Sequence, residues 1–258
     1  MSPSSRTGVS APAQLAGKVA IIAGGTGGVG KATARLFAEA GATIVIGYNR
    51  RATEADAIAA ALPNGGHRAL HAPMEDTAAL NRLADEVTSA FGRADILINT
   101  AGFTREVKHA ELAALDDALI DAIFIANWRG PFALVRALAP LLKASGDGLI
   151  VNVSSIAAFN GTGSNIAYGA SKAALDSMTR SLARALAPEV RALAVSPGAI
   201  DTTFVPGRDA AWNARFAQTV PLKRIATAND VALAVLACAT HLTYSTGSVI
   251  VVDGGRLL

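Results

Sequence analysis

GGTGGVGK, residues 24–31, is the stretch on which the fold depends, and it fits three patterns of phosphate-binding turn at once. The matches are GxGxxG on Gly25, Gly27 and Gly30, GxxxxGK from Gly25 to Lys31, and GxxxGxG on Gly24, Gly28 and Gly30. The first and third patterns are two registers of a dinucleotide-binding turn, whereas the second is typical of a nucleoside triphosphatase. A single glycine pattern is weak support for any of them, so the surrounding sequence has to decide.

The residues on either side of this stretch favour a dinucleotide. KVAIIAG (18–24) reads as a buried strand and residues 29–40 as a helix, so N–H groups at the helix start would face a phosphate. A triphosphatase needs Ser or Thr after the lysine to bind Mg²⁺, but Ala32 stands there. The simple NAD pattern needs an acid at the end of the second strand, and GYNRR (47–51) has none. Two dinucleotide registers therefore remain open.

The rest of the chain alternates short β-branched runs with longer Ala- and Leu-rich segments. Strands are predicted at 18–24, 42–47, 67–72, 94–100, 148–154, 190–196 and 247–253. Helices are predicted at 29–40, 52–62, 76–91, 166–187 and 227–239, with a long helical region at 111–144 that is interrupted near NWRGP. Continuous apolar strands are buried on both faces, which indicates a parallel sheet of about seven strands between two helical layers. The predicted fold class is α/β, a three-layer doubly wound Rossmann fold.

The length and composition of the chain indicate a globular protein. A chain of 258 residues, 51% hydrophobic, suits one domain, placed at 15–258 after a Ser- and Pro-rich tail (1–14) that we expect to be disordered. The net charge of +3, without a basic run, does not favour nucleic acid. No apolar stretch approaches the ~20 residues of a membrane span, so we expect a cytoplasmic protein with no membrane contact. The single cysteine, Cys238, is expected to be a buried, inert thiol.

YGASK (168–172) decides between the two dinucleotide registers. It places Tyr168 and Lys172 four residues apart on one helix face, and Ser155 lies thirteen residues upstream at a predicted strand end. With these residues the sequence strongly resembles the short-chain dehydrogenase/reductase family in its compact form of roughly 250 residues. The matching motifs, in family order, are AGGTGGVG, NTAG at 99–102, Asn127, Ser155, YGASK, SPGAIDT at 196–202 and TGSVIVVDGG at 246–255.

The resemblance implies GxxxGxG as the working register and a nicotinamide cofactor. The residues that it implies for cofactor binding are Gly24, Thr26, Gly28, Val29, Gly30, Asn49, Arg50, Arg51, Asn99, Ala101, Gly102, Tyr168, Lys172, Pro197, Gly198, Ile200 and Thr202. No metal ion is expected. The absence of an acid after the second strand, with Asn49, Arg50 and Arg51 there instead, favours NADP(H) over NAD(H), because guanidinium groups pair with a 2′-phosphate.

The resemblance also implies the catalytic residues. Tyr168 resembles the family's general acid/base, Ser155 the group that positions the substrate carbonyl, and Lys172 both a tyrosine activator and a ribose ligand. Asn127 resembles the asparagine that holds a water in the proton relay. A tyrosine can exchange a proton near neutral pH if its pKa, normally ~10, is lowered, and a nearby lysine favours the phenolate. Ser154 is a poorer candidate than Ser155, since a strand points the two hydroxyls to opposite faces.

Substrate choice is expected to come from residues 201–222, the least regular part of the chain. Phe204, Trp212 and Phe216 lie there as in a lid over an apolar pocket, although packing against the body is an alternative with at least as much support. Phe159 and Asn160 are further candidates for the pocket lining. The expected substrate is a small or medium ketone or secondary alcohol.

Three functions stay open at this point. An NADP(H)-dependent ketone reductase is the main hypothesis, and an NAD-dependent sugar or polyol dehydrogenase is the alternative within the family. A non-catalytic, cofactor-sensing binding protein would be expected to carry a broken Ser–Tyr–Lys set, and this set is intact. The family resemblance also implies a homotetramer, with the long helices and the C-terminal strand region at its interfaces.

Overall fold

The computed structural model describes residues 14–205, 207 and 209–258 of the chain. The predicted tail at 1–14 therefore lies outside the described residues, except for Gln14, which begins a turn. The packed core begins at Leu15, which is 3% exposed and belongs to the same buried apolar cluster as Phe37 and Ala38.

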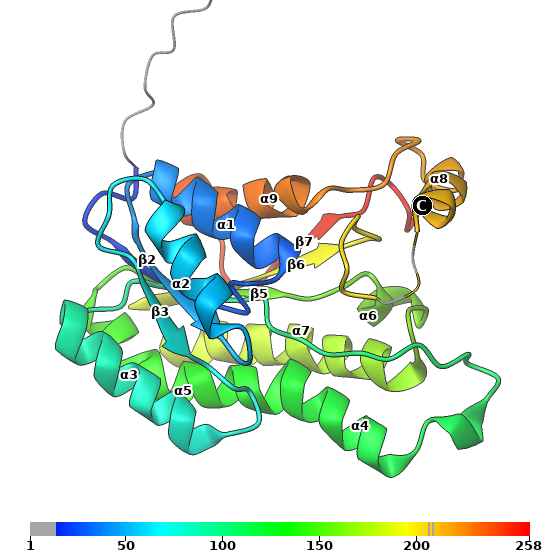
Figure 1. Ribbon diagram of the computed structural model, residues 1–258, viewed down its shortest axis with the longest axis horizontal. Coiled ribbons are helices and arrows are strands. Elements are labelled where there is room, and N and C mark those ends of the chain that lie inside the picture. Colours follow the sequence, from blue (N-terminus) through cyan, green and yellow to red (C-terminus); the bar gives the residue numbers. More distant parts are fainter. Residues whose placement is uncertain (1–13, 206, 208) are drawn as a thin grey trace, which may run out of the picture.

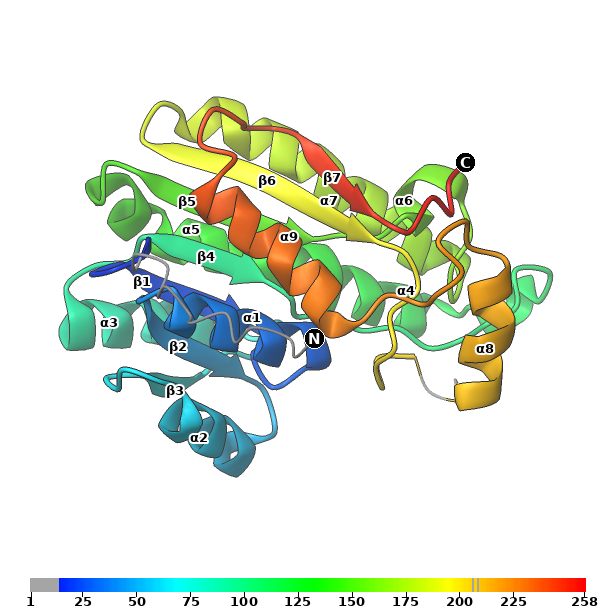
Figure 2. The same ribbon diagram turned by 90° about the horizontal axis from the view of Figure 1, so that it is seen from above.

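The centre of the molecule is a parallel sheet of seven strands in the order β3-β2-β1-β4-β5-β6-β7 (Figure 2). The strands are β1 (Val19–Ala23), β2 (Thr43–Tyr48), β3 (Arg68–His71), β4 (Ile96–Asn99), β5 (Gly148–Val153), β6 (Val190–Pro197) and β7 (Val249–Val252). Every residue of β1, β4 and β5 is buried, as their continuous apolar runs predict. The predicted doubly wound α/β fold is confirmed.

Two helical layers cover the sheet (Figure 1). Helices α1 (Gly28–Glu39), α2 (Ala52–Ala61) and α9 (Ala228–Thr240) pack on one face, around Phe37, Ile44 and Val231. Helices α3 (Thr77–Phe91), α5 (Gly130–Ala144) and α7 (Ile166–Leu186) pack on the other, around Leu83 and Leu138. Three shorter pieces are η1 (Leu112–Ala114), α6 (Ala157–Asn160) and α8 (Ala210–Gln218).

The strand order reverses next to β1, because β1 pairs with β2 on one side and with β4 on the other. The connection after β1 runs over one face of the sheet, and the connection after β4 runs over the other. This leaves a crevice outside the carboxyl ends of β1 and β4. GGTGGVGK follows β1 and NTAG follows β4, so the fold brings both motifs to this crevice.

The helical region before β5 is continuous, whereas the sequence analysis predicted an interruption near NWRGP. Helix α4 (Asp117–Phe124) continues through a π turn (Ile125–Arg129) into α5, and Gly130 and Pro131 fit without a break. Joined in this way, Asp117–Ala144 is the one helix of the described residues that is long and apolar enough to span a membrane, with mean hydropathy 1.3. The sequence analysis did not single out this segment, because polar and charged residues such as Asp121, Asn127 and Arg136 interrupt its apolar runs. Its apolar side is built into the core against α3 and α7.

Candidate active site

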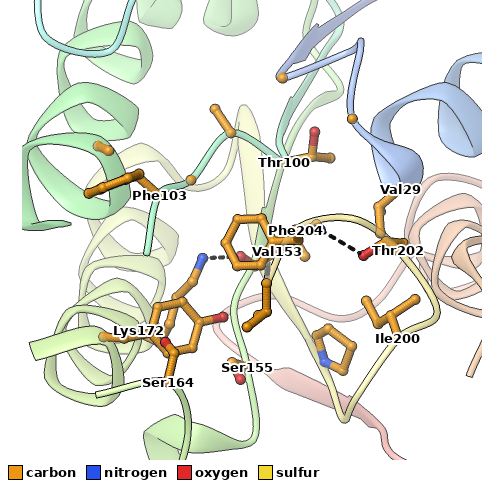
Figure 3. A pocket seen from close by; sticks show the side chains of 18 of the residues that line it. Val29, Thr100, Phe103, Val153, Ser155, Ser164, Lys172, Ile200, Thr202 and Phe204 are labelled. Carbon is orange, nitrogen blue, oxygen red and sulfur yellow. Dashed lines mark hydrogen bonds between the residues drawn. The ribbon is translucent and has the colours of Figure 1, made fainter. Parts of the chain in front are cut away.

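A cavity of about 1040 Å³ opens at the crevice outside the strand ends. In the view of Figure 3, Lys172 and Ser164 lie to one side of Phe204, Val29, Ile200 and Thr202 lie to the other, and Ser155 lies below it. Most of the candidate residues from the sequence line this cavity: Gly24, Thr26, Gly28, Val29, Gly30, Asn49, Arg50, Arg51, Ala101, Gly102, Ser155, Tyr168, Lys172, Pro197, Gly198, Ile200, Thr202 and Phe216. Asn99, Asn127, Phe159 and Trp212 are not among its lining residues.

The glycine turn after β1 is held too tightly for side chains. Gly24 has a φ of +79°, and a Cβ there would lie 2.6 Å from the nitrogen of Ala101. A Cβ on Gly30 would lie 2.3 Å from the carbonyl oxygen of Gly24, and one on Gly28 would lie 2.8 Å from the Thr202 methyl group. Helix α1 starts at this turn without a side-chain cap and without an acid in its first turn. The turn therefore fits a dinucleotide, whose phosphates would meet N–H groups at the helix start.

The end of β2 brings cations to the same cavity. Arg51 pairs with Glu54 (Nη1–Oε2 3.0 Å), whereas Arg50 has no ion pair with an acid in the part of the chain that the structure describes. Asn49 donates a hydrogen bond from Nδ2 to Glu75 (3.2 Å). Glu75 also lines the cavity, so a carboxylate lies at this end that the sequence analysis did not identify.

Helix α7 carries Tyr168 and Lys172 to the cavity from a well-fixed N-terminus. Asn165 caps this helix, because its Oδ1 accepts a hydrogen bond from the N–H of Tyr168 (2.7 Å). The Nδ2 of Asn165 donates to the carbonyl of Arg105 (2.7 Å), which ties the cap to the segment after β4. The first turn of α7 is thus tied to the segment after β4.

Lys172 is a buried cation beside Tyr168. Its Nζ donates to the carbonyl oxygen of Val153 (2.8 Å; Figure 3) and lies 5.9 Å from the centroid of the Tyr168 ring. Burial lowers the pKa of Lys172 to about 8, and the charge of Asp176 partly opposes that shift. Lys172 is therefore mostly protonated at neutral pH and titrates close above it.

Ser155 and Ser154 follow β5, and their hydroxyl groups have different hydrogen-bond partners. Both residues are among the lining residues of the cavity, and Ser155 Oγ accepts a hydrogen bond from the N–H of Ala157 (3.2 Å). Ser154 is 3% exposed, and its Oγ donates to the carbonyl oxygen of Lys172 (3.2 Å). The Ser154 hydroxyl thus joins the end of β5 to helix α7, whereas the Ser155 hydroxyl makes no such link.

Asn127 and Asn99 lie behind the cavity wall and not in it. Asn127 Oδ1 accepts from the N–H of Phe103 (2.8 Å), and its Nδ2 donates to the Phe103 carbonyl (3.1 Å) and to Ser171 Oγ (3.0 Å). Asn99 Nδ2 donates to Asn152 Oδ1 (2.8 Å) on the neighbouring strand. Asn127 thus braces the loop after β4, and Asn99 links β4 to β5. The π turn around Asn127 brings Ile125 and Ala126 to the lining.

Two of the aromatic residues expected at the substrate, Phe204 and Phe216, line the cavity. Helix α8 lies beyond the carboxyl ends of the strands in both views (Figures 1 and 2). The rings of Trp212 and Phe216 stack with centroids 4.9 Å apart, and Phe216 lines the cavity. The ring of Phe204 lies 6.2 Å from that of Tyr168. Phe159 is 52% exposed on α6, and its neighbour Asn160 lines the cavity in its place.

Three residues that the sequence analysis did not select also bear on the site. Phe103 and Arg256 line the cavity, and Asp176 is 4% exposed one helical turn after Lys172. Phe103 directly follows the NTAG motif, which was a usable signal. Arg256 lies one residue past the last motif and Asp176 four past Lys172, and only the fold shows where they point.

A doubly wound sheet with a glycine turn at its switch point defines a dinucleotide-binding protein. A family model described as enoyl-(acyl carrier protein) reductase matches residues 23–256. The chain belongs to the short-chain dehydrogenase/reductase family, and it is an oxidoreductase that uses a nicotinamide cofactor.

Two curated relatives and one solved structure illustrate the similarity. A Streptomyces violaceoruber protein, named as a ketoacyl reductase of the granaticin polyketide synthase, is 38% identical and aligns over 93% of this chain and 96% of its own. The cis-4-hydroxycyclohexanecarboxylate dehydrogenase of Sinomonas cyclohexanicum is 36% identical, over 93% and 97%. A Brucella melitensis structure described as a glucose/ribitol dehydrogenase superimposes with a TM-score of 0.88 at 29% identity, over 96% and 100%.

Proposed function

We propose that the protein reduces a small or medium ketone to a secondary alcohol with NADPH, using Tyr168 as the general acid. The observation that carries the proposal is the meeting of Tyr168, Ser155 and the buried, charged Lys172 at one cavity that also receives the glycine turn. Relatives named as a ketoacyl reductase and a hydroxycarboxylate dehydrogenase agree with chemistry at a carbonyl or secondary alcohol carbon.

Each residue has a defined task in this reaction. A bound nicotinamide cofactor would supply the hydride for the carbonyl carbon, and the turn at Gly24–Gly30 and Lys172 would hold that cofactor. Because Ser155 Oγ already accepts a hydrogen bond from Ala157, its own hydrogen can be donated to the substrate oxygen. The Tyr168 hydroxyl then gives its proton to that oxygen, which completes the alcohol and leaves a phenolate. The charge of Lys172 stabilises the phenolate.

Replacing Tyr168 by Phe tests this assignment. Loss of the exchangeable proton is expected to lower kcat by about 10²- to 10⁴-fold, with NADPH binding, followed by fluorescence titration, unchanged. Tyr244→Phe is the matched control, since Tyr244 is fully exposed and away from the cavity. If Tyr168→Phe keeps most of the wild-type kcat, another group supplies the proton and the mechanism is wrong.

The NADPH preference rests on the end of β2. Arg50 faces the cavity without an acidic partner among the described residues, and a 2′-phosphate could take that place. Glu75 at the same end favours the alternative, an NAD-dependent sugar or polyol dehydrogenase, because a carboxylate can accept from ribose hydroxyls. Comparing kcat/KM for NADPH and NADH in wild type and Arg50→Ala separates the two. If Arg50→Ala leaves the ratio of kcat/KM for NADPH to that for NADH unchanged, Arg50 does not determine the cofactor preference.

We also propose a cytoplasmic location. The one helix with the length of a membrane span in the described chain contributes Leu134, Leu138 and Leu142 to the core, each fully buried. Fractionation of cells that express the full chain tests this, and recovery in the membrane pellet would contradict it.

A further inference from the structure

One cation of the cavity wall lies beside helix α8. Arg256 lines the cavity, and its guanidinium carbon lies 5.7 Å from the centroid of the Phe216 ring. It forms no ion pair with any acid in the described ranges, although Asp253 is three residues away. The two carboxylate oxygens of Asp253 accept instead from the N–H groups of Gly255 and Leu257, each at 2.8 Å. The charge of Arg256 is therefore left to solvent or to a ligand.

No carboxylate competes for Arg256 inside the cavity. Among the described lining residues the single acid is Glu75, which is engaged by Asn49 at the β2 end. The lining also includes the apolar residues Phe204, Val205 and Phe216, of which Phe204 lies beside Tyr168 and Phe216 beside Arg256. A ligand that reaches from Ser155 and Tyr168 to Arg256 would thus meet a polar pair, apolar side chains and a positive charge.

We propose that Arg256 binds a carboxylate on the substrate, so that the preferred ketones are oxo acids with an apolar segment between the carbonyl and the carboxylate. This rests on the proposed ketone reductase function. A guanidinium can donate two parallel hydrogen bonds to a carboxylate, and contact with the Phe216 ring favours a fixed orientation of the planar group. The residue thereby selects substrates without taking part in proton or hydride transfer.

Arg256→Gln, which keeps a polar side chain and removes the charge, tests the proposal. Because the distance from the carbonyl to Arg256 is set by the substrate, the probes are a series: 4-oxopentanoate, 5-oxohexanoate and 6-oxoheptanoate, each with its neutral methyl ester. Wild type is expected to prefer the acid of at least one pair, and Arg256→Gln to lose about tenfold to a hundredfold in kcat/KM for that acid. The esters should change by less than about threefold. Arg215→Gln is the matched control, an exposed arginine beside Phe216 that does not line the cavity.

A second readout does not depend on turnover. Binding of hexanoate to the full chain saturated with NADP⁺, measured by calorimetry, should be weakened in Arg256→Gln and unchanged in Arg215→Gln. If no ketone is reduced but this difference is found, the reductase proposal fails and the carboxylate site stands. Equal hexanoate binding by wild type and Arg256→Gln, or equal losses on acids and esters, would overturn the site.

Discussion

Burial of the Lys172 charge lowers the stability of the fold, although the proposed reaction needs that charge. Lys172 is 4% exposed, and its pKa of about 8 lies below the ordinary 10.5 because burial disfavours the charged form. A proton therefore binds more readily to the unfolded chain than to the folded one. The cost to stability is full below pH 8, falls as the pH rises from 8 to 10.5, and disappears above that.

Lys172→Met is accordingly expected to raise stability while abolishing turnover. The shift from 10.5 to about 8 corresponds to about 3 kcal/mol at pH 7, less whatever the lost hydrogen bond to Val153 contributes. Urea unfolding at pH 7 and pH 10 measures the difference, which should shrink at the higher pH. Lys143→Met, at an exposed position on α5, is the control and should show no such pH dependence. A gain that is equal at both pH values would show that burial of the charge is not its origin.

Asp176 is the residue expected to keep Lys172 charged. Burial raises the pKa of Asp176, while the nearby Ser154 hydroxyl and the charges of Arg180 and Lys172 oppose that rise. Its Oδ1 is buried without a hydrogen-bond partner in the described structure, so the carboxylate acts on Lys172 mainly through its charge. Asp176 is a positioning residue, since Lys172 and not Asp176 lines the cavity.

Asp176→Asn is expected to shift the pH above which kcat falls, in addition to any loss of activity. Removing the negative charge lowers the pKa of Lys172 further, so Lys172 loses its proton at a lower pH. The alkaline limb of kcat against pH is expected to shift to lower pH than in wild type, with KM for NADPH changed little. Asp85→Asn, on the exposed side of α3, should leave the profile in place. A uniform loss of kcat across the pH range would instead indicate a purely structural role for Asp176.

At the level of elements, the sequence was sufficient wherever apolar periodicity coincided with a turn signal. All seven predicted strands are present, and helix α3 begins one residue from its predicted start, where Asp76 caps it by accepting from the N–H of Ala79. The π turn at Ile125–Arg129 was not predicted, because Gly130 and Pro131 are read as helix breakers when neighbouring contacts are unknown. Which of two aromatic residues on α8 faces the cavity likewise depends on tertiary packing.

Dependence on tertiary packing also explains which residues of the candidate site could be predicted from the sequence. Motifs gave the residues of the glycine turn, because backbone geometry there excludes side chains whatever the substrate is. Asn99 belongs to a motif yet bonds to Asn152 inside the sheet, and a motif does not distinguish bracing from lining. Arg256 and Glu75 reach the cavity from segments without any motif, so they required the fold.

The β1–α1 turn predicts two very different costs for the same substitution. Ala at Gly30 would place its Cβ 2.3 Å from the Gly24 carbonyl oxygen, so the backbone of the turn would have to move. Gly92 ends α3 with a φ of +67° and has open space around it, so Ala there costs only about 1 kcal/mol of conformational strain. Gly30→Ala is expected to lose more stability than Gly92→Ala in urea unfolding and to weaken NADPH binding at least tenfold. Similar losses for the two variants would mean that the turn is adaptable.

On the scale of the whole molecule, one edge of the sheet is left apolar and open. Strand β7 is the last strand of the order, and Val251 on it is 42% exposed. Leu233 on α9, the helix that packs against β7, is 49% exposed. Exposed apolar sheet edges are usually covered, and the family resemblance implies an interface in this C-terminal region. We therefore propose that copies of the chain associate across the β7–α9 edge.

Light scattering after size exclusion is the measurement for this assembly. The full chain of 26.2 kDa is expected to elute as a tetramer. Val251→Lys and Leu233→Lys each place a charge on the proposed contact, and both should shift the mass to a smaller species at the same protein concentration. Leu112→Lys is the matched control, because Leu112 is 69% exposed on η1, which is not part of that edge. A wild-type mass of one chain would reject the assembly, whereas a tetramer that survives both lysine substitutions would place its contacts on other elements.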